Sequence, residues 1–77
     1  MAYLAIQTAS NYVRPTWPNV EGHQQMMLHL DFEVVDLEAA VVDAVERGAR
    51  EAVFQPQDNV RVLLDPAGHP FCLYRGE

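Results

Sequence analysis

The stretch from Met27 to Gly48 constrains the fold of this chain more than any other. Over residues 27–34 apolar and ionisable side chains alternate, which is typical of a strand with one oily and one polar face. Asp36 then stands where a helix N-cap is expected, and Gly48 where a helix ends. Between them lies an apolar stripe with helical spacing, formed by Leu37, Ala40, Val41, Ala44 and Val45. The oily strand face is therefore expected to cover this helix, leaving His29, Asp31 and Glu33 on the opposite side.

Strands are predicted on both sides of this unit. The apolar, β-prone residues 3–8 predict an N-terminal strand within residues 1–9. Residues 10–25 form a linker, because Pro15 and Pro18 prevent a regular element from running through it. After the helix, strands are predicted at residues 51–55, 60–64 and 71–75. Residues 26–77 thus read as one strand–helix–strand–strand–strand (βαβββ) module.

The turn between the last two strands decides which residue faces Cys72. Asp65-Pro66-Ala67-Gly68 has proline and glycine where a type I turn with a bulge needs them. That turn would place Val62 opposite Cys72, whereas a two-residue loop would place Arg61 there. The bulged turn is favoured, and Arg61 is kept as a secondary candidate for the site.

Composition narrows the class of protein. The chain has 77 residues, enough for one small domain. Its net charge is −6, and it contains no lysine. Binding to nucleic acid or an anionic membrane surface needs clustered positive charge and is not expected, and Schiff-base catalysis is excluded. There is no membrane-spanning or signal-like segment, and a single cysteine suits a reducing cytoplasm. The expected fold is α+β: one helix on a curved, mostly antiparallel sheet with an extra N-terminal strand.

Two segments resemble a known superfamily. HLDFEVVDLEAAVVDAVERGA (residues 29–49) and VRVLLDPAGHPFCLY (residues 60–74) are similar to the vicinal-oxygen-chelate superfamily of glyoxalases, bleomycin-resistance proteins and extradiol dioxygenases. Within this superfamily the resemblance is strongest to the glyoxalase-like domain group, whose members often have a linker like Thr16-Trp17-Pro18. The resemblance implies two modules around one cavity, of which this chain covers the second and only the end of the first. A homodimer is therefore expected to complete the cavity, the alternative being a fragment of a longer protein.

The resemblance also bears on metal binding. His29 matches a histidine that ligates metal in metal-dependent members, but the position of their glutamate ligand is occupied by Cys72. A thiol suits zinc or copper better than magnesium, manganese or iron. Two His29 and two Cys72 could form a zinc site across a dimer. Alternatively, Cys72 is a small buried residue, or a nucleophile with His29 as its base.

The function expected from these features is metal-independent small-molecule binding, in a pocket for neutral or cationic ligands and without a cofactor. One alternative is a lyase, isomerase or dioxygenase with a divalent metal held by His29. Another is an orphan structural module without a working site. Asp31 and Glu33 could instead face solvent, and Trp17 and Tyr12 could either cover the pocket or only pack. The expected ligand-binding residues are His29, Asp31, Glu33, Cys72, Tyr74, Arg61 and Trp17.

Overall fold

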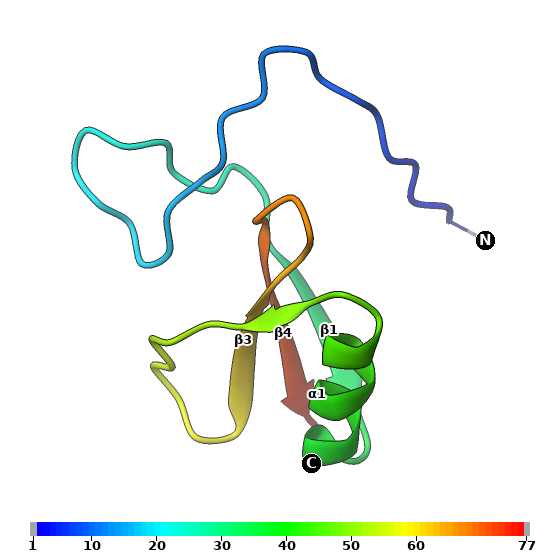
Figure 1. Cartoon of the computed structure of the whole chain (residues 1–77). Helices are drawn as coiled ribbons and strands as arrows, with labels where there is room; N and C mark the ends of the chain where they lie inside the picture. The colour runs from blue at the N-terminus through cyan, green and yellow to red at the C-terminus, as the bar shows by residue number, and fades with distance from the viewer. Residues whose placement is uncertain (1, 77) are drawn as a thin grey trace.

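The computed structural model of the chain describes residues 2–76 and confirms the α+β class (Figure 1). One helix packs on a four-stranded mixed sheet with strand order β1-β4-β3-β2. β1 and β4 are parallel, while the β4–β3 and β3–β2 pairs are antiparallel, so the sheet is mostly antiparallel. The elements in chain order are β1 (Leu30–Val34), α1 (Leu37–Glu46), β2 (Arg50–Glu51), β3 (Val60–Leu64) and β4 (Pro70–Arg75).

Both predicted ends of α1 are confirmed. At its start, Asp36 Oδ1 accepts a hydrogen bond of 3.1 Å from the backbone N–H of Ala39. At its end, Gly48 has a φ of +112°, and its N–H donates to the Val45 carbonyl over 3.0 Å. The N–H of Ala49 donates to the Ala44 carbonyl over 3.0 Å, which completes a Schellman motif.

The bulged turn between β3 and β4 is also confirmed. The Gly68 N–H donates to the Asp65 carbonyl over 2.8 Å, and Gly68 has a φ of +92°. Val62 lies opposite Cys72 and Arg61 opposite Leu73, so the two-residue loop is excluded. Arg61 therefore lies on the face of β3 opposite to that of Val62.

The Asp65 carboxylate holds this turn together. Its Oδ1 accepts hydrogen bonds of 2.9 Å from the backbone N–H groups of Ala67 and His69. Burial alone would raise the pKa of Asp65, but these bonds and the His69 ring outweigh it and hold the pKa below its ordinary value. Tyr12 and Arg14 of the linker donate hydrogen bonds to the Ala67 and Pro66 carbonyls. The linker is therefore attached to the turn.

Two predicted strands are shorter than expected. The strand predicted at residues 27–34 begins only at Leu30, and the one predicted at residues 51–55 is β2, Arg50–Glu51. The second difference has a clear cause in the side-chain amide of Gln55. Its Oε1 accepts the Val62 N–H and its Nε2 donates to the carbonyls of Ala52 and Val62, each over 2.8 Å. The Gln55 amide thus makes hydrogen bonds with Val62 of β3 that the backbone of a longer β2 would otherwise make. β2 therefore need not continue beyond Glu51.

The N-terminal strand prediction is wrong. The segment 2–9 pairs with no strand of the described chain, and Leu4 is 65% exposed. A strand needs a partner edge for its backbone hydrogen bonds, and this segment lies across a hollow from β1 instead of pairing with it. The predicted N-terminal segment starts at Met1 and the predicted module ends at Glu77. Both residues lie outside the described part of the chain.

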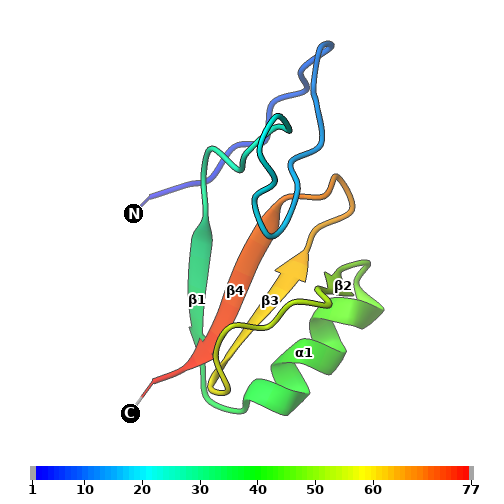
Figure 2. The ribbon, with the colours of Figure 1, turned by 90° about the vertical axis from the view of Figure 1, so that its left-hand side faces the viewer.

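The helix does not cover the strand that was predicted to pack against it. α1 contacts mainly β4, β2 and β3, and Figure 2 shows it beside β2 and β3, with β1 at the far edge of the sheet. Phe32 on β1 is consequently 46% exposed. Leu63 and Leu73 are buried on the helix side, while Ala52, Val62 and Cys72 form a buried cluster on the other side.

A helix that spans a membrane must be long and apolar, and among residues 2–76 no helix meets both conditions.

Candidate functional site

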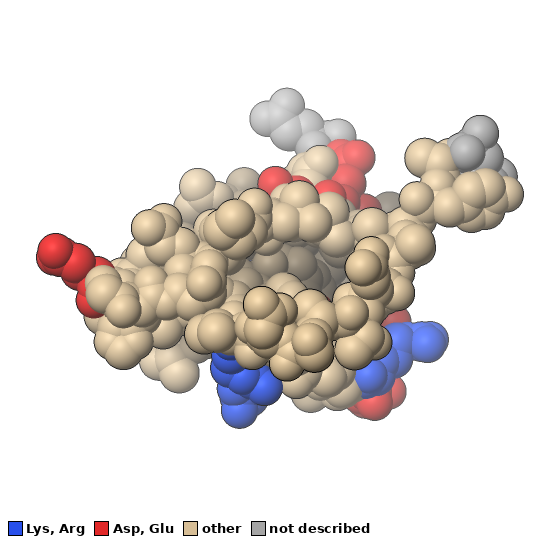
Figure 3. Space-filling model, turned by 90° about the horizontal axis from the view of Figure 1, so that it is seen from above, with Lys and Arg blue, Asp and Glu red and all other residues tan. Residues whose placement is uncertain are grey.

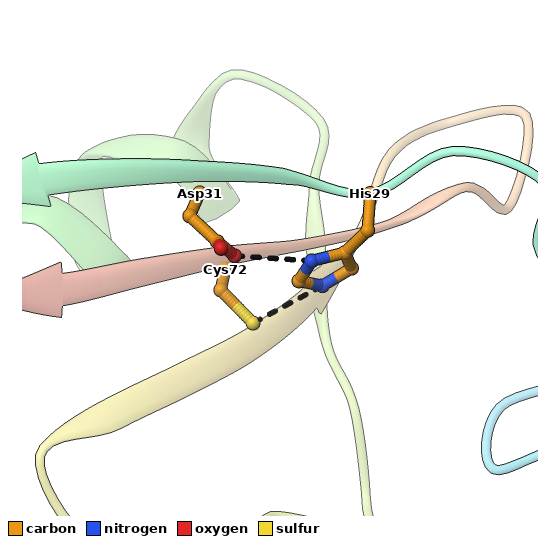
Figure 4. A group of neighbouring side chains, drawn as sticks. All are labelled: His29, Asp31 and Cys72. Atoms are coloured by element: carbon orange, nitrogen blue, oxygen red, sulfur yellow. Dashed lines mark hydrogen bonds and ion pairs between the residues drawn. The ribbon is translucent and has the colours of Figure 1, made fainter.

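Three ionisable side chains meet on the sheet face that points away from α1. The parallel pairing of β1 with β4 places Asp31 beside Cys72, and His29 directly precedes β1. His29 Nδ1 lies 3.0 Å from Asp31 Oδ1, and His29 Nε2 lies 3.3 Å from Cys72 Sγ. Figure 4 shows the carboxylate and the thiol on the same side of the imidazole ring, each facing one ring nitrogen. The three side chains therefore form one hydrogen-bonded chain.

The direction of the protons in this chain follows from what each group can donate. The Asp31 carboxylate only accepts, so it holds the His29 proton on Nδ1. Nε2 is then a lone pair facing the thiol, and the Cys72 S–H donates to it. The side chain of His29 is 26% exposed and that of Asp31 57%, whereas Cys72 is buried. The carboxylate thus lies at the rim of the site and the thiol at its floor.

The environment of Cys72 keeps its proton in place. Burial raises the pKa of the thiol above its ordinary value, and the charge and hydrogen bonding of Asp31 raise it further. A thiolate here would lose hydration and face a nearby negative charge. The resting form of Cys72 is therefore the neutral thiol.

These groups line a hollow of about 420 Å³. Its walls are mainly apolar, and Trp17 of the linker and Val60 pack against the buried cluster that includes Cys72. The indole Nε1 of Trp17 donates to the Phe54 carbonyl over 3.2 Å. The centres of the Trp17 and Phe54 rings lie 6.2 Å apart. The linker is thereby fixed over the same face of the sheet as the His29–Asp31–Cys72 cluster.

The structure brings most of the predicted site residues together. Five of them line the hollow: His29, Asp31, Cys72, Tyr74 and Trp17. Glu33 is paired with Tyr74 in the sheet, but its carboxylate lies against Gly76, outside the hollow. Arg61 is directed elsewhere as well, because its guanidinium donates to the carbonyls of Gln57, Asp58 and Val60 and lies 3.7 Å from Glu51.

Several lining residues were not predicted from the sequence. They are Met26, Pro56, Gln57 and Val60, whereas Val62 was placed opposite Cys72 by the favoured turn but not counted as a ligand-binding residue. Val60 and Val62 share the face of Cys72, and the alternation of β3 identifies both once the bulged turn fixes the register. Pro56 and Gln57 belong to the loop between β2 and β3, whose path depends on the Gln55 amide and carries no pattern in the sequence.

Comparison with known proteins identifies the family. A family profile described as "Glyoxalase-like domain" matches residues 2–74. The chain belongs to this family. The glyoxalase-like domain therefore falls within the vicinal-oxygen-chelate superfamily, whose members bind small molecules. No match was found among curated proteins or among solved structures.

The metal that the superfamily implies can be tested against the donors of this glyoxalase-like domain. One potential ligand atom each from His29, Asp31 and Cys72 lies within 4.8 Å of the others, which is the spacing of a candidate metal site. In the structure the Asp31 carboxylate is engaged with Nδ1, so an ion on Nε2 and Sγ would gain a third ligand from this chain only if that carboxylate turned toward it. A hard ion also prefers oxygen to a protonated thiol. This donor set therefore differs from the histidine and glutamate ligands of the metal-dependent members and suits their hard ions less well.

Proposed function

We propose that this glyoxalase-like domain binds a neutral or cationic small molecule in the hollow above Cys72, without a metal. The observation that carries the proposal is the position of a hydrogen-bonded acid–imidazole–thiol chain at the floor of an otherwise apolar hollow. Apolar walls with a few convergent polar groups are typical of ligand sites. Asp31 is the one charged side chain in that lining, so anionic ligands are disfavoured. The single cysteine is a free thiol, which suits a reducing cytoplasm.

A second copy of the chain is proposed to complete the enclosure. Besides Pro70, the described chain buries only five apolar residues, and no residue of α1 is buried. In contrast, Leu4, Ile6, Leu28 and Phe32 are exposed around a second apolar hollow that includes the open side of β1. Viewed from above, much of the surface is uncharged and hollowed near its centre (Figure 3). Exposed apolar surface of this kind favours association.

Ligand binding is tested by screening neutral and cationic metabolites and antibiotics. Trp17 is the only tryptophan, so its fluorescence reports on the hollow directly. A ligand present at 100 times its Kd is expected to stabilise the fold by about 2.7 kcal/mol, seen as a higher Tm. The shift should persist after chelator treatment and weaken in Val60→Phe, because Val60 is a partly buried lining residue and a larger side chain there narrows the hollow. Absence of any shift would favour a structural module, and loss of the shift with chelator would favour a metal enzyme.

The oligomeric state gives a separate prediction. Sedimentation equilibrium at low micromolar concentration is expected to give twice the chain mass of 8.7 kDa. Phe32→Asp should shift the equilibrium toward monomer, because it places a charge on the exposed apolar surface, while Val53→Asp, at another exposed site, should not. A monomer that unfolds cooperatively would contradict the proposed dimer.

A further inference from the structure

We infer that Cys72 forms a covalent bond with α,β-unsaturated carbonyl compounds, and that His29 exchanges the proton of the reaction. The inference rests on the hollow of the proposed function and names the chemical class of its ligand. It is carried by the 3.3 Å contact between Cys72 Sγ and His29 Nε2 and by the position of both groups in an apolar lining.

The arrangement has the three parts that an activated nucleophile needs. A thiol is within hydrogen-bond reach of a base, and the base is oriented by a third group, Asp31, at 3.0 Å. Because Asp31 keeps the His29 proton on Nδ1, the atom that faces the thiol is free to accept its proton. The buried thiol is protonated at rest, so its attack on a ligand requires transfer of the proton to His29 Nε2, which lies 3.3 Å away.

Addition to an unsaturated ketone or aldehyde balances with these groups alone. The thiol proton moves to His29 Nε2 while Sγ attacks the β-carbon of the ligand. The C–S bond forms and the π bond between the α- and β-carbons breaks. Its electron pair forms a new π bond between the α-carbon and the carbonyl carbon, and the carbonyl π pair moves onto the oxygen. The imidazolium then returns its proton to the resulting enolate, leaving a saturated thioether. No group leaves, and no oxidant, reductant or water is consumed.

The choice of ligand class follows from the lining. A thiol is a soft nucleophile and prefers the polarisable β-carbon of a conjugated carbonyl compound. The rings of Trp17 and Tyr74 and the side chains of Val60 and Val62 offer an apolar surface to the body of such a molecule. Asp31 disfavours anionic electrophiles. The geometry thus points to a neutral, apolar enone.

The probe is 4-phenylbut-3-en-2-one, with its saturated analogue 4-phenylbutan-2-one as the non-reactive partner. Intact-mass spectrometry is expected to show one enone added to each chain, and peptide mapping to place it on Cys72. The reaction should be at least about tenfold faster than that of N-acetylcysteine at the same pH. A rate no faster than N-acetylcysteine, or an adduct elsewhere in the chain, would overturn the inference.

Variants separate the roles of the three side chains. Cys72→Ser should abolish the adduct, and His29→Gln should slow its formation by about 100-fold. His23→Gln is the matched control, because His23 is an exposed linker histidine outside the hollow. Asp31 is a positioning residue: Asp31→Asn should slow the reaction by about tenfold and change the tautomer of His29, which ¹⁵N NMR detects. Equal rates for the wild type and a folded His29→Gln would overturn the inference.

The saturated analogue separates this inference from the proposed function. If 4-phenylbutan-2-one quenches Trp17 fluorescence but the enone forms no adduct, the hollow binds small molecules and the covalent step is wrong. If the enone forms an adduct only at the rate of N-acetylcysteine, and neither the analogue nor any compound of the neutral and cationic panel binds, both proposals are wrong. The rate relative to N-acetylcysteine also tests the inference without any variant.

Discussion

Leu63→Ala is expected to lower the free energy of unfolding by about 3 kcal/mol, the largest effect of any single substitution considered. Leu63 is fully buried, at 0% exposure, on the face of β3 that α1 covers. The described chain buries few other apolar side chains, so neighbouring residues can fill the resulting cavity only in part. A domain of this size has little stability to lose, and urea unfolding followed by far-UV circular dichroism measures the change.

The control for Leu63 is Val53→Ala. Val53 is an exposed apolar residue in the loop after β2, so its truncation should change the unfolding free energy by less than about 0.5 kcal/mol. If Leu63→Ala cost no more than Val53→Ala, the helix would not be packed on β3 as described.

Gln55→Ala is expected to lower the free energy of unfolding by about 2 kcal/mol, although glutamine is a polar residue in a loop. Its Oε1 accepts the N–H of Val62, and Val62 is 2% exposed. Without the amide this N–H is left without a partner, whereas the Val62 carbonyl still accepts the Ala52 N–H over 3.0 Å. Urea unfolding measures the loss, and the amide proton of Val62 should exchange faster with solvent.

Two variants test the explanation for Gln55. Gln57→Ala removes an exposed glutamine from the same loop, and its effect should be below about 0.5 kcal/mol. Gln55→Glu keeps an acceptor for the Val62 N–H but turns a carboxylate toward two carbonyl oxygens, so it should not restore stability. Full stability in Gln55→Glu would show that donation to those carbonyls is unimportant.

Local signals in the sequence predicted much of the fold. The ends of α1 and the β3–β4 turn depend on Asp36, Gly48 and the Asp65–Gly68 segment, each of which satisfies backbone groups within a few residues. The N-terminal strand and the extent of β2 could not be predicted in the same way. Strand formation depends on a partner distant in sequence, and at β2 the Gln55 side chain took that partner's place.

The candidate site was predictable where it depended on alternation. His29, Asp31, Cys72 and Tyr74 were placed on one face by the period of their strands, and the structure keeps them together. Alternation also placed Glu33 on that face, but it could not show that the side chain turns toward Gly76. The contact between His29 and Cys72 required the β1–β4 pairing, which joins residues 43 positions apart and leaves no local signal.

The position of β4 has a consequence for biosynthesis. β4 follows every other strand in the sequence, yet it lies between β1 and β3 in the sheet. Until a ribosome has released this segment, β1 has no neighbour and the imidazole has no thiol beside it. Pairing of strands far apart in a chain is slow compared with helix formation. The local contacts of α1 can therefore form before the β1–β4 pairing that brings His29 to Cys72.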